Sequence, residues 1–138
     1  MPRPKLQRKI CSPPIMLGFK PFGLPHCKRK VVILLYDEYE AFRLCEYENL
    51  TQEKAAEKMN VSRPTLTRIY EKALKTIAKA FVEGNAISIE GGEVAFDAQW
   101  VKCRKCYETF QLHQHKKCCE DCNFEHLINL NPSWKKTN

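Results

Sequence analysis

Two helices joined by a very short turn dominate the middle of the sequence. Thr51 and Ser62 carry the kind of side chain preferred at helix N-caps, so each marks the start of a helix. Asn60 precedes Val61 between them, and asparagine tolerates the positive φ of a tight turn better than any residue except glycine. Pro64 falls in the first turn of the second helix, where a missing amide costs little. The pattern predicts a helix, a tight turn and a second, longer helix.

The longer helix has the clearest periodicity in the chain. Its apolar residues recur three or four positions apart and define the side expected to be buried: Leu66, Ile69, Tyr70, Ala73, Leu74, Ile77 and Phe81. Its basic residues recur at similar spacing on another side: Arg68, Lys72, Lys75 and Lys79. Gly84 followed by Asn85 is a glycine-led stop signal. We therefore expect an amphipathic helix that ends at Gly84 and carries one basic stripe.

An earlier helix is expected to complete a three-helix domain. Asp37 can cap its first turn, with Glu40 three residues later forming a capping-box-like pair. The apolar side of this helix follows helical spacing: Ala41, Leu44 and Cys45. The helix should stop near Asn49. The short helix after Thr51 should direct three residues inward: Ala55, Ala56 and Met59.

The tight turn has the spacing of a helix-turn-helix, with the small Ala56 where the two helices cross. In such units the N-terminal residues of the second helix reach base edges in the major groove of DNA. That places six residues on the expected DNA side: Ser62, Arg63, Pro64, Thr65, Thr67 and Arg68. Lys72 suits a phosphate contact. The alternative is an ordinary three-helix bundle whose basic stripe is merely solvated.

The first 30 residues form a separate basic segment. They contain eight Lys or Arg, no acid and six of the eight prolines, and proline disfavours a helix. We expect an extended arm with strand-like pieces at 8–11 and 15–19, and we assign Arg3 and Lys5 to DNA. Residues 31–60 hold seven acids and three bases, whereas residues 61–81 hold five bases and one acid. Two basic regions therefore flank an acidic one, which suits a polyanionic ligand. A solvated, disordered arm is the alternative.

Beyond the longer helix the pattern changes to that of strands. Ile87 and Ile89 alternate with other residues, and residues 93–101 are again strand-like. Gly91 and Gly92 between them can form a turn. This segment predicts a small β-hairpin.

Two C-x2-C pairs dominate the end of the chain. Cys103 and Cys106 are separated by twelve residues from Cys119 and Cys122. Four thiolates at this spacing complete the tetrahedral shell of structural Zn²⁺, although iron in a rubredoxin-like site would use the same ligands. Such a closed site leaves no position open for hydrolytic catalysis. Disulfides are disfavoured, because nothing at the N-terminus indicates export.

Several cysteine assignments stay open. Cys118, His113 or His115 could replace Cys119 as a ligand, because all three lie in or beside the same loop. Three further cysteines lack a partner at C-x2-C spacing: Cys11, Cys27 and Cys45. The first two could serve another metal site or a thiol switch. Cys45 lies on the inner side of a helix and is expected to be a small core residue.

Four segments of the first two-thirds of the chain resemble a family of small, uncharacterised prokaryotic proteins predicted to bind DNA. They are Met1–Lys5, Phe19–Pro25, Asp37–Leu44 and Thr51–Arg63. The helix-turn-helix of this family is similar to region four of sigma factors. Over residues 1–92 the resemblance implies a role like that of a transcription regulator, with a DNA face at Ser62, Arg63, Thr65 and Arg68. Family members are often associated with a dinitrogenase iron–molybdenum-cofactor-like domain, and this chain departs from them by ending in a cysteine-rich module.

These observations predict a mainly α fold in two modules. Residues 1–92 should form the basic arm, the helix-turn-helix domain and the small β-hairpin. Residues 93–130 should form a zinc-ribbon-like module, and residues 131–138 a polar tail. The longest apolar run, Val31–Leu35, is far too short to span a membrane. We therefore expect a cytoplasmic, nucleoid-associated protein without a membrane partner.

The expected function is sequence-specific binding of double-stranded DNA by a non-catalytic transcription regulator. The sequence offers no catalytic constellation. A homodimer is a reasonable expectation, because one recognition helix reads only a short half-site. The zinc module could contact the transcription machinery or another protein. One rival is a metal- or redox-responsive adaptor whose helix-turn-helix is only a scaffold. Another is a binder of RNA or single strands that stacks bases on Phe19, Phe22 and Tyr36.

Overall fold

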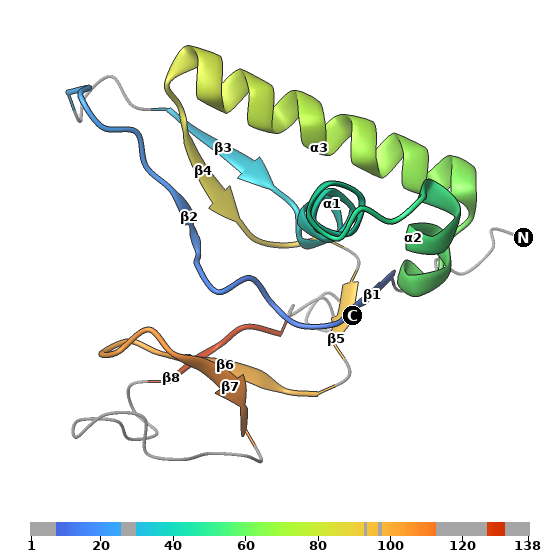
Figure 1. Cartoon of the computed structure of the whole chain (residues 1–138). Helices are drawn as coiled ribbons and strands as arrows, with labels where there is room; N and C mark the ends of the chain where they lie inside the picture. The colour runs from blue at the N-terminus through green and yellow to red at the C-terminus, as the bar shows by residue number, and fades with distance from the viewer. Residues whose placement is uncertain (1–7, 26–29, 93, 97, 113–126, 132–138) are drawn as a thin grey trace, which may run out of the picture.

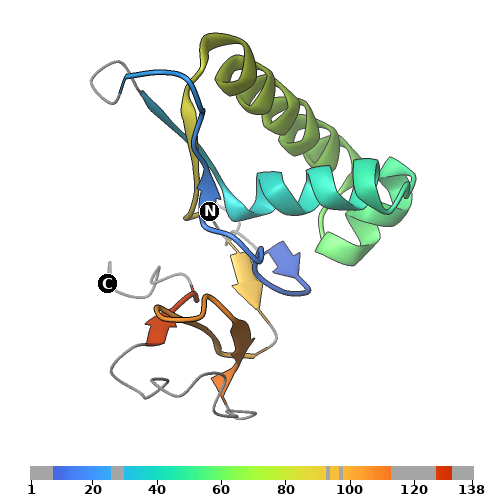
Figure 2. The same cartoon turned by 60° about the vertical axis from the view of Figure 1, so that its left-hand side comes forward.

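The computed structural model of the protein describes residues 8–25, 30–92, 94–96, 98–112 and 127–131. Helix α3 lies across one side of a small sheet, α1 and α2 pack beside it, and a second small sheet lies at the far end of the molecule (Figures 1 and 2). The helices are α1 (Tyr36–Phe42), the π-helical η2 (Arg43–Tyr47), α2 (Gln52–Met59) and α3 (Arg63–Glu83). The strands are β1 (Arg8–Ile10), β2 (Gly18–Phe19), β3 (Val31–Leu34), β4 (Ala86–Ile89), β5 (Val94–Phe96), β6 (Trp100–Cys103), β7 (Thr109–Gln111) and β8 (Leu127–Asn129).

The described fold is mixed α/β, where the sequence predicted a mainly α fold. The described strands form three small sheets, with the orders β1-β5, β2-β4-β3 and β7-β6-β8. Several of these strands have only two to four residues, and such short stretches carry little periodicity in the sequence. Among the helices in the described ranges, none combines the length and apolar character needed to cross a lipid bilayer.

The central sheet is built from strands distant in the sequence. β4 pairs parallel with β3, in a register that sets Val31 beside Ala86 and Leu34 beside Ile89. β4 also pairs antiparallel with β2. All the helices of the described ranges lie between β3 and β4 along the chain, as a parallel pair of strands requires a long crossover.

The predicted hairpin between residues 86–90 and 93–101 is wrong. β4 lies between β2 and β3, and β5 pairs instead with β1, in parallel, with Arg8 beside Val94. The two-glycine segment does change the chain direction, since Gly91 and Gly92 have φ of 72° and 96°. Its carbonyl at Gly91, however, accepts a hydrogen bond from the Tyr36 amide at 3.2 Å. The Gly91–Gly92 segment is therefore bound to the start of α1, and it does not return the chain so that β5 could pair with β4.

Helix α1 begins earlier than predicted. Its N-cap is Leu35, whose backbone amide donates to Glu38 Oε1 at 2.9 Å, so Glu38 rather than Glu40 is the carboxylate that reaches back to the N-cap, and the leucine side chain supplies no acceptor in return. Asp37 lies inside the first turn, where its carboxylate accepts from the Glu38 amide. The helical path continues from α1 through η2 to Tyr47, and it stops near Asn49 as predicted, where the backbone has a φ of 57°.

The predicted signals around α2 and α3 are confirmed. The Thr51 side chain accepts from the Lys54 amide at 3.2 Å, which caps α2. Asn60 ends α2 in the left-handed region, with φ 57° and ψ 44°. The Ser62 side chain accepts from the amide of Thr65 at 3.3 Å and caps α3. Gly84 closes α3 with φ 69°.

Two buried clusters hold these elements together. The first joins α1, η2, α2 and α3 through Ala41, Leu44, Ala55, Ala56, Met59, Leu66 and Ile69. The second joins α3 to the strands through Ile10, Leu34, Tyr36, Ala73, Ile89 and Val94. The small Ala56 lies in the first cluster, as expected for a residue at a helix crossing.

The buried side of α3 is narrower than the sequence predicted. Leu74 is 37% exposed and Phe81 is 86% exposed, although both belong to the apolar periodicity of the helix. Ala73 is buried as predicted, and Ala80, which was not in the predicted set, is buried as well. α3 has 21 residues and extends beyond α1 and α2. The small central sheet covers only one side of its C-terminal half.

A buried lysine connects the β7-β6-β8 sheet to the N-terminal part of the chain through a hydrogen bond. In this sheet β6 pairs antiparallel with both β7 and β8. Lys102 on β6 is only 3% exposed, and its Nζ donates to the carbonyl oxygen of Ile15 at 2.6 Å. The connection thus reaches from β6 to the segment between β1 and β2.

Candidate nucleic-acid interface and cysteine turn

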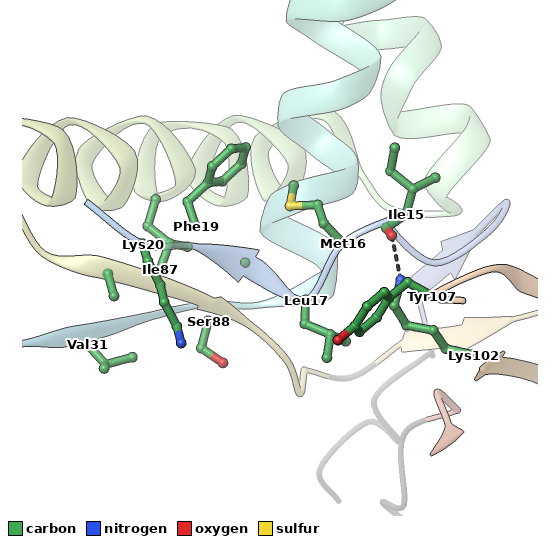
Figure 3. Close-up of a pocket in the computed structure, with 12 residues that line it drawn as sticks. Ile15, Met16, Leu17, Phe19, Lys20, Val31, Ile87, Ser88, Lys102 and Tyr107 are labelled. Atoms are coloured by element: carbon green, nitrogen blue, oxygen red, sulfur yellow. Dashed lines mark hydrogen bonds between the residues drawn. The ribbon is translucent and has the colours of Figure 1, made fainter. Parts of the chain in front are cut away.

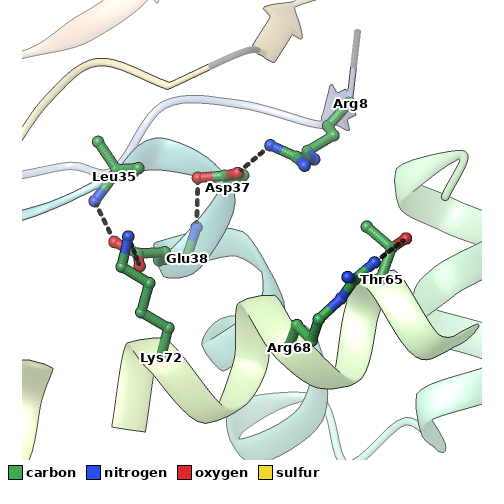
Figure 4. A network of polar contacts seen from close by, with 7 residues as sticks. All are labelled: Arg8, Leu35, Asp37, Glu38, Thr65, Arg68 and Lys72. Atoms are coloured by element: carbon green, nitrogen blue, oxygen red, sulfur yellow. Dashed lines mark hydrogen bonds and ion pairs between the residues drawn. The ribbon is translucent and has the colours of Figure 1, made fainter. Parts of the chain in front are cut away.

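A small polar network covers the first turn of α3. The Ser62 hydroxyl donates to Thr65 Oγ1 at 2.8 Å, and Arg68 Nη2 donates to the same oxygen at 3.3 Å. Figure 4 shows the Arg68 side chain lying back along the helix to reach Thr65. Ser62 and Arg68 are exposed and Thr65 is half-buried. The network holds the guanidinium over the start of the helix, with most of its five donors still open to solvent.

Arg63 and Pro64 complete the exposed start of α3. Both are exposed, and the Arg63 side chain forms no ion pair with any residue in the described ranges. The first amides of the helix have no intrahelical partner, and they add positive potential at this end. The residues predicted for the DNA side are therefore brought together here, with two exceptions.

Thr67 is the first exception, because it points towards α2. Its hydroxyl donates to Gln52 Oε1 and also lies 3.1 Å from the Arg63 carbonyl oxygen. The side chain is half-buried between the helices. Thr67 therefore braces α2 against α3 and does not face outward with Arg63 and Arg68.

Lys72 is the second exception, because it leans towards α1. Its Nζ lies 3.8 Å from Glu38 Oε2, too far for a hydrogen bond but close enough for an ion pair. The Glu38 side chain is only 3% exposed, and its Oε2 is buried with no hydrogen-bond partner among the described residues, beside Lys72 (Figure 4). A cation nearby offsets part of the cost of burying that carboxylate. A phosphate contact by Lys72 would have to compete with Glu38.

The part of the basic arm around Arg8 and Cys11 is bound to α1 by acidic side chains. Arg8 Nη1 lies 2.7 Å from Asp37 Oδ2, whose side chain is 4% exposed. The Cys11 amide donates to Glu40 Oε2 at 3.0 Å, and Arg43 Nε donates to Glu40 Oε1. Arg3 and Lys5 lie outside the described residues. The acidic run of α1 therefore anchors the arm where it enters the fold.

The sequence did not reveal these internal partners. The Arg8–Asp37 ion pair and the Cys11–Glu40 hydrogen bond each join residues 29 positions apart. The run of three acids in the first turns of α1, beside a basic arm, was the available signal. That signal indicates an attraction between the arm and α1, but it does not identify which residues form the pairs.

The first C-x2-C pair forms a compact turn at the end of β6. The amide of Lys105 donates to Cys103 Sγ at 3.4 Å, and the amide of Tyr107 donates to the Cys103 carbonyl oxygen at 2.9 Å. Tyr107 has a positive φ of 64°. Cys103 is buried and Cys106 is exposed. An amide directed at a sulfur favours the thiolate, which is the form that binds metal.

The other predicted ligands cannot be placed. Cys119 and Cys122, as well as Cys118, His113 and His115, lie outside the described residues. Within the part of the chain that is described, no three metal-ligating side chains gather in one place. The register of β6 and β8 sets Cys103 beside Leu127, the fifth residue after Cys122.

The remaining cysteines differ in their surroundings. Cys45 is partly buried and packs against the cluster around Leu44, as predicted. Burial raises the pKa of its thiol, and the negative charge of Glu46 raises it further. Cys11 is exposed, and Cys27 lies outside the described residues.

A cavity of about 590 Å³ lies where the two parts of the molecule meet (Figure 3). Apolar side chains of the β2 and β3 region, including Leu17 and Val31, form much of it, and Lys102 and Tyr107 close the far side. Lys20 and Ser88 also line it, and the Ser88 hydroxyl donates to Glu90 Oε2 at 2.8 Å. Because its lining combines apolar side chains with two lysines, a serine and a tyrosine, the cavity selects no single class of ligand.

Comparison with known proteins identifies a family for most of the chain. The family model described as "Protein of unknown function DUF134" matches residues 1–97. A "UPF0251 protein" of Chloroherpeton thalassium is 39% identical over 132 residues, which cover 94% of this chain and 87% of the relative. The corresponding protein of Halothermothrix orenii is 40% identical over 131 residues, covering 91% of this chain and 97% of the relative. That of Moorella thermoacetica is 38% identical over 133 residues, covering 96% and 89%.

The relatives match more of the chain than the family model does. Their alignments cover more than nine-tenths of this chain, so they extend beyond residue 97 into the cysteine-bearing segment. No solved structure matches the chain.

Proposed function

This chain belongs to the DUF134 family of proteins of unknown function, and we propose that it binds double-stranded DNA sequence-specifically through the first turn of α3. The observation that carries the proposal is the exposed network of Ser62, Thr65 and Arg68. A network of polar side chains on an exposed helix start contributes little to a core. It does hold an arginine in a defined position before any ligand arrives, which lowers the entropic cost of binding.

The arrangement of α2 and α3 supports a helix-turn-helix of the sigma-region-four kind. α2 ends at Asn60 in a left-handed turn, and two residues later Ser62 caps the exposed start of α3. A major groove about 12 Å wide admits one α-helix. Inserted by its N-terminal end, α3 would present Arg63 and Arg68 to base edges. An arginine can pair with O6 and N7 of guanine through two hydrogen bonds.

The remaining contacts in this proposal are to the DNA backbone. Ser62 and the free amides of the first turn of α3 suit a phosphate. The basic arm, with Arg3 and Lys5, would add salt-dependent attraction from the point where Arg8 anchors it to Asp37. Thr67 and Lys72 are left out of the contact set, because Gln52 and Glu38 engage them. The role that follows is that of a non-catalytic transcription regulator.

A structural metal site is the second part of the proposal. Cys103 and Cys106 would supply two ligands, and Cys119 and Cys122 the other two. The observation that supports it is the hydrogen bond from the Lys105 amide to Cys103 Sγ, within a turn that brings a second cysteine three residues later. Four thiolates would make a closed Zn²⁺ site that stabilises the small β7-β6-β8 sheet, with rubredoxin-like iron as the lesser alternative.

The DNA proposal is tested by binding assays with the full chain. After selection of a preferred duplex, fluorescence anisotropy compares Arg68→Ala with Lys79→Ala, which removes a cation from the other end of α3. Loss of a bidentate base contact of about 1–3 kcal/mol corresponds to roughly 5- to 150-fold weaker binding. We expect that loss for Arg68→Ala on the preferred duplex, a smaller loss on random duplex, and near-wild-type binding for Lys79→Ala.

Two results would contradict the DNA proposal. Equal losses on preferred and random duplexes would remove Arg68 from base recognition. No affinity of the wild-type chain for any duplex at low salt would favour the adaptor function instead, in which the helices support protein contacts.

The metal proposal is tested on the same preparation. Metal content measured by mass spectrometry should give one Zn²⁺ per chain, and Cys103→Ser should lower it while Cys45→Ser leaves it unchanged. A metal content that does not respond to Cys103→Ser would contradict the ligand assignment.

A further inference from the structure

A row of exposed apolar residues marks the C-terminal half of α3. Leu74, Ala78, Phe81 and Val82 follow helical spacing, and all four are exposed. Phe81 and Val82 are 86% and 81% exposed. Residues with this spacing and this composition usually face a core. Here they remain uncovered, in the half of the helix farther along the chain from Ser62.

The last residue of β2 and the segment that follows it enlarge this apolar surface. Phe19 and Pro21 line the same groove as Phe81, a hollow of about 380 Å³. Phe19 is 64% exposed and Phe22 is 99% exposed. The three residues that share this groove, Phe19, Pro21 and Phe81, together with their exposed sequence neighbours Phe22 and Val82, are called the aromatic patch below.

The aromatic patch is large for a monomer of this size. An aromatic side chain contributes about 150–250 Å², and the exposed fractions of the three phenylalanines correspond to about two and a half such side chains. They alone present roughly 400–600 Å², which already equals the largest apolar patch of a typical monomer. With Val82 and Pro21 added, the surface approaches the roughly 800 Å² per partner of a standard protein interface.

We propose that the aromatic patch is the interface of a twofold-symmetric homodimer. The patch faces its own copy, so each Phe81 packs into the groove beside Phe19 of the other subunit. A twofold interface must be complementary to itself. The border of the patch carries both signs of charge, since Lys20 lines the groove and Glu83 follows Val82. Rotation about one axis can therefore oppose Lys20 of one copy to Glu83 of the other.

The length of α3 makes this interface suitable for binding two half-sites, a consequence that rests on the proposed function. Thr65 and Phe81 are sixteen residues apart on one helix, which corresponds to about 24 Å along its axis. Half-sites one turn of DNA apart are separated by about 34 Å. Two α3 helices that meet near Phe81 at about a right angle would set their Thr65 residues about 34 Å apart. Both DNA-binding turns would then reach successive major grooves on one face of the duplex.

The interface is tested by the mass of the full chain in solution. Sedimentation at micromolar concentrations should show the wild type as a dimer, twice the 16.1 kDa of the chain. Phe81→Glu places a charge in the patch without touching the core and should give the monomer. Tyr47→Glu is the matched control, because Tyr47 is 81% exposed outside the patch and its variant should stay dimeric. Phe22→Ser, at a residue 99% exposed, should weaken the dimer independently.

The outcomes separate the interface from the DNA-binding function. A wild-type chain that is monomeric both alone and on a duplex with two half-sites would overturn the proposed dimer, and so would a Phe81→Glu chain that remains dimeric. A monomeric Phe81→Glu chain that binds one half-site like the wild type, but loses cooperative binding to two, supports the dimer. If the wild type is dimeric, Phe81→Glu is monomeric and neither binds any duplex, the interface stands and the DNA-binding function fails.

Discussion

The hydroxyl of Thr67 on α3 donates a hydrogen bond to the side-chain oxygen of Gln52 on α2. These residues lie 15 positions apart, on either side of the left-handed turn at Asn60. The bond joins the first residue of α2 to the second turn of α3. The angle between α2 and α3, and with it the position of the Ser62–Thr65–Arg68 network, therefore depends on a polar contact as well as on the packing of Ala56 and Leu66.

Thr67→Val tests this brace. Valine keeps the shape of threonine but cannot donate, so we expect a loss of about 1 kcal/mol in the free energy of unfolding, the usual net value of one hydrogen bond. Urea denaturation measures it. Thr67→Ser keeps the hydroxyl and should restore most of the stability. If Thr67→Val were as stable as the wild type while Thr67→Ser was destabilised, methyl packing rather than the hydrogen bond would be the stabilising contact.

Arg8→Ala tests the anchor of the basic arm. The substitution leaves the Asp37 carboxylate, whose side chain is 4% exposed, without its ion-pair partner. Removing one partner of a buried pair costs about 3 kcal/mol. We expect a destabilisation of that order in thermal or urea unfolding, together with weaker β1–β5 pairing.

Lys9→Ala is the matched control for the arm. Lys9 is the neighbouring cation, it is exposed, and it has no ion pair among the residues of known position. Its removal should change the unfolding free energy by less than about 0.5 kcal/mol. Similar losses for both variants would show that total charge, not the Arg8–Asp37 pair, stabilises the arm.

The elements that the sequence predicted well are set by neighbouring residues. Thr51, Asn60, Ser62 and Gly84 act on amides and carbonyls within one helical turn, so their effects can be inferred locally. The exposed start of α3 follows from the same caps. These signals located both the helices and the core of the candidate site.

The elements that were missed depend on partners far along the chain. β4 carries the same residues whether it pairs with β5 or with β3, and only the path of the intervening helices decides between them. Likewise, the periodicity of α3 does not reveal that the central sheet is too small to cover Phe81. The contacts of Thr67 and Lys72 with other helices were missed for the same reason, since Gln52 and Glu38 approach α3 from α2 and α1.

Gly18→Ala tests the close pairing of β2 with β4. Gly18 has a φ of 154°, and a Cβ at this position would lie 1.9 Å from the carbonyl oxygen of Ile87. Because that oxygen belongs to the backbone of β4, the strands would have to separate. We expect a loss of more than about 2 kcal/mol in unfolding free energy, with the strained backbone contributing about 1–3 kcal/mol of the cost.

Gly23→Ala separates the clash from the backbone preference. Gly23 also has a positive φ, of 78°, but a Cβ there would meet nothing within 4 Å. Only the conformational penalty of roughly 1 kcal/mol should remain. Equal effects at Gly18 and Gly23 would mean that β2 and β4 are not in close contact in solution.

The reactivity of Cys45 follows from its surroundings. Burial raises the pKa of its thiol, and the nearby Glu46 carboxylate raises it further. Because the thiolate is the reactive form, a raised pKa lowers the reactive fraction at any pH below it. Iodoacetamide at pH 8 should therefore modify Cys45 at least about tenfold more slowly than the exposed Cys11. Peptide mapping by mass spectrometry distinguishes the two sites. Glu46→Gln should reduce the difference in rate between the two cysteines, because it removes the negative charge beside Cys45. Urea should abolish the difference, because it exposes the Cys45 thiol. Equal rates in the folded protein would contradict the packing of Cys45 against the cluster around Leu44.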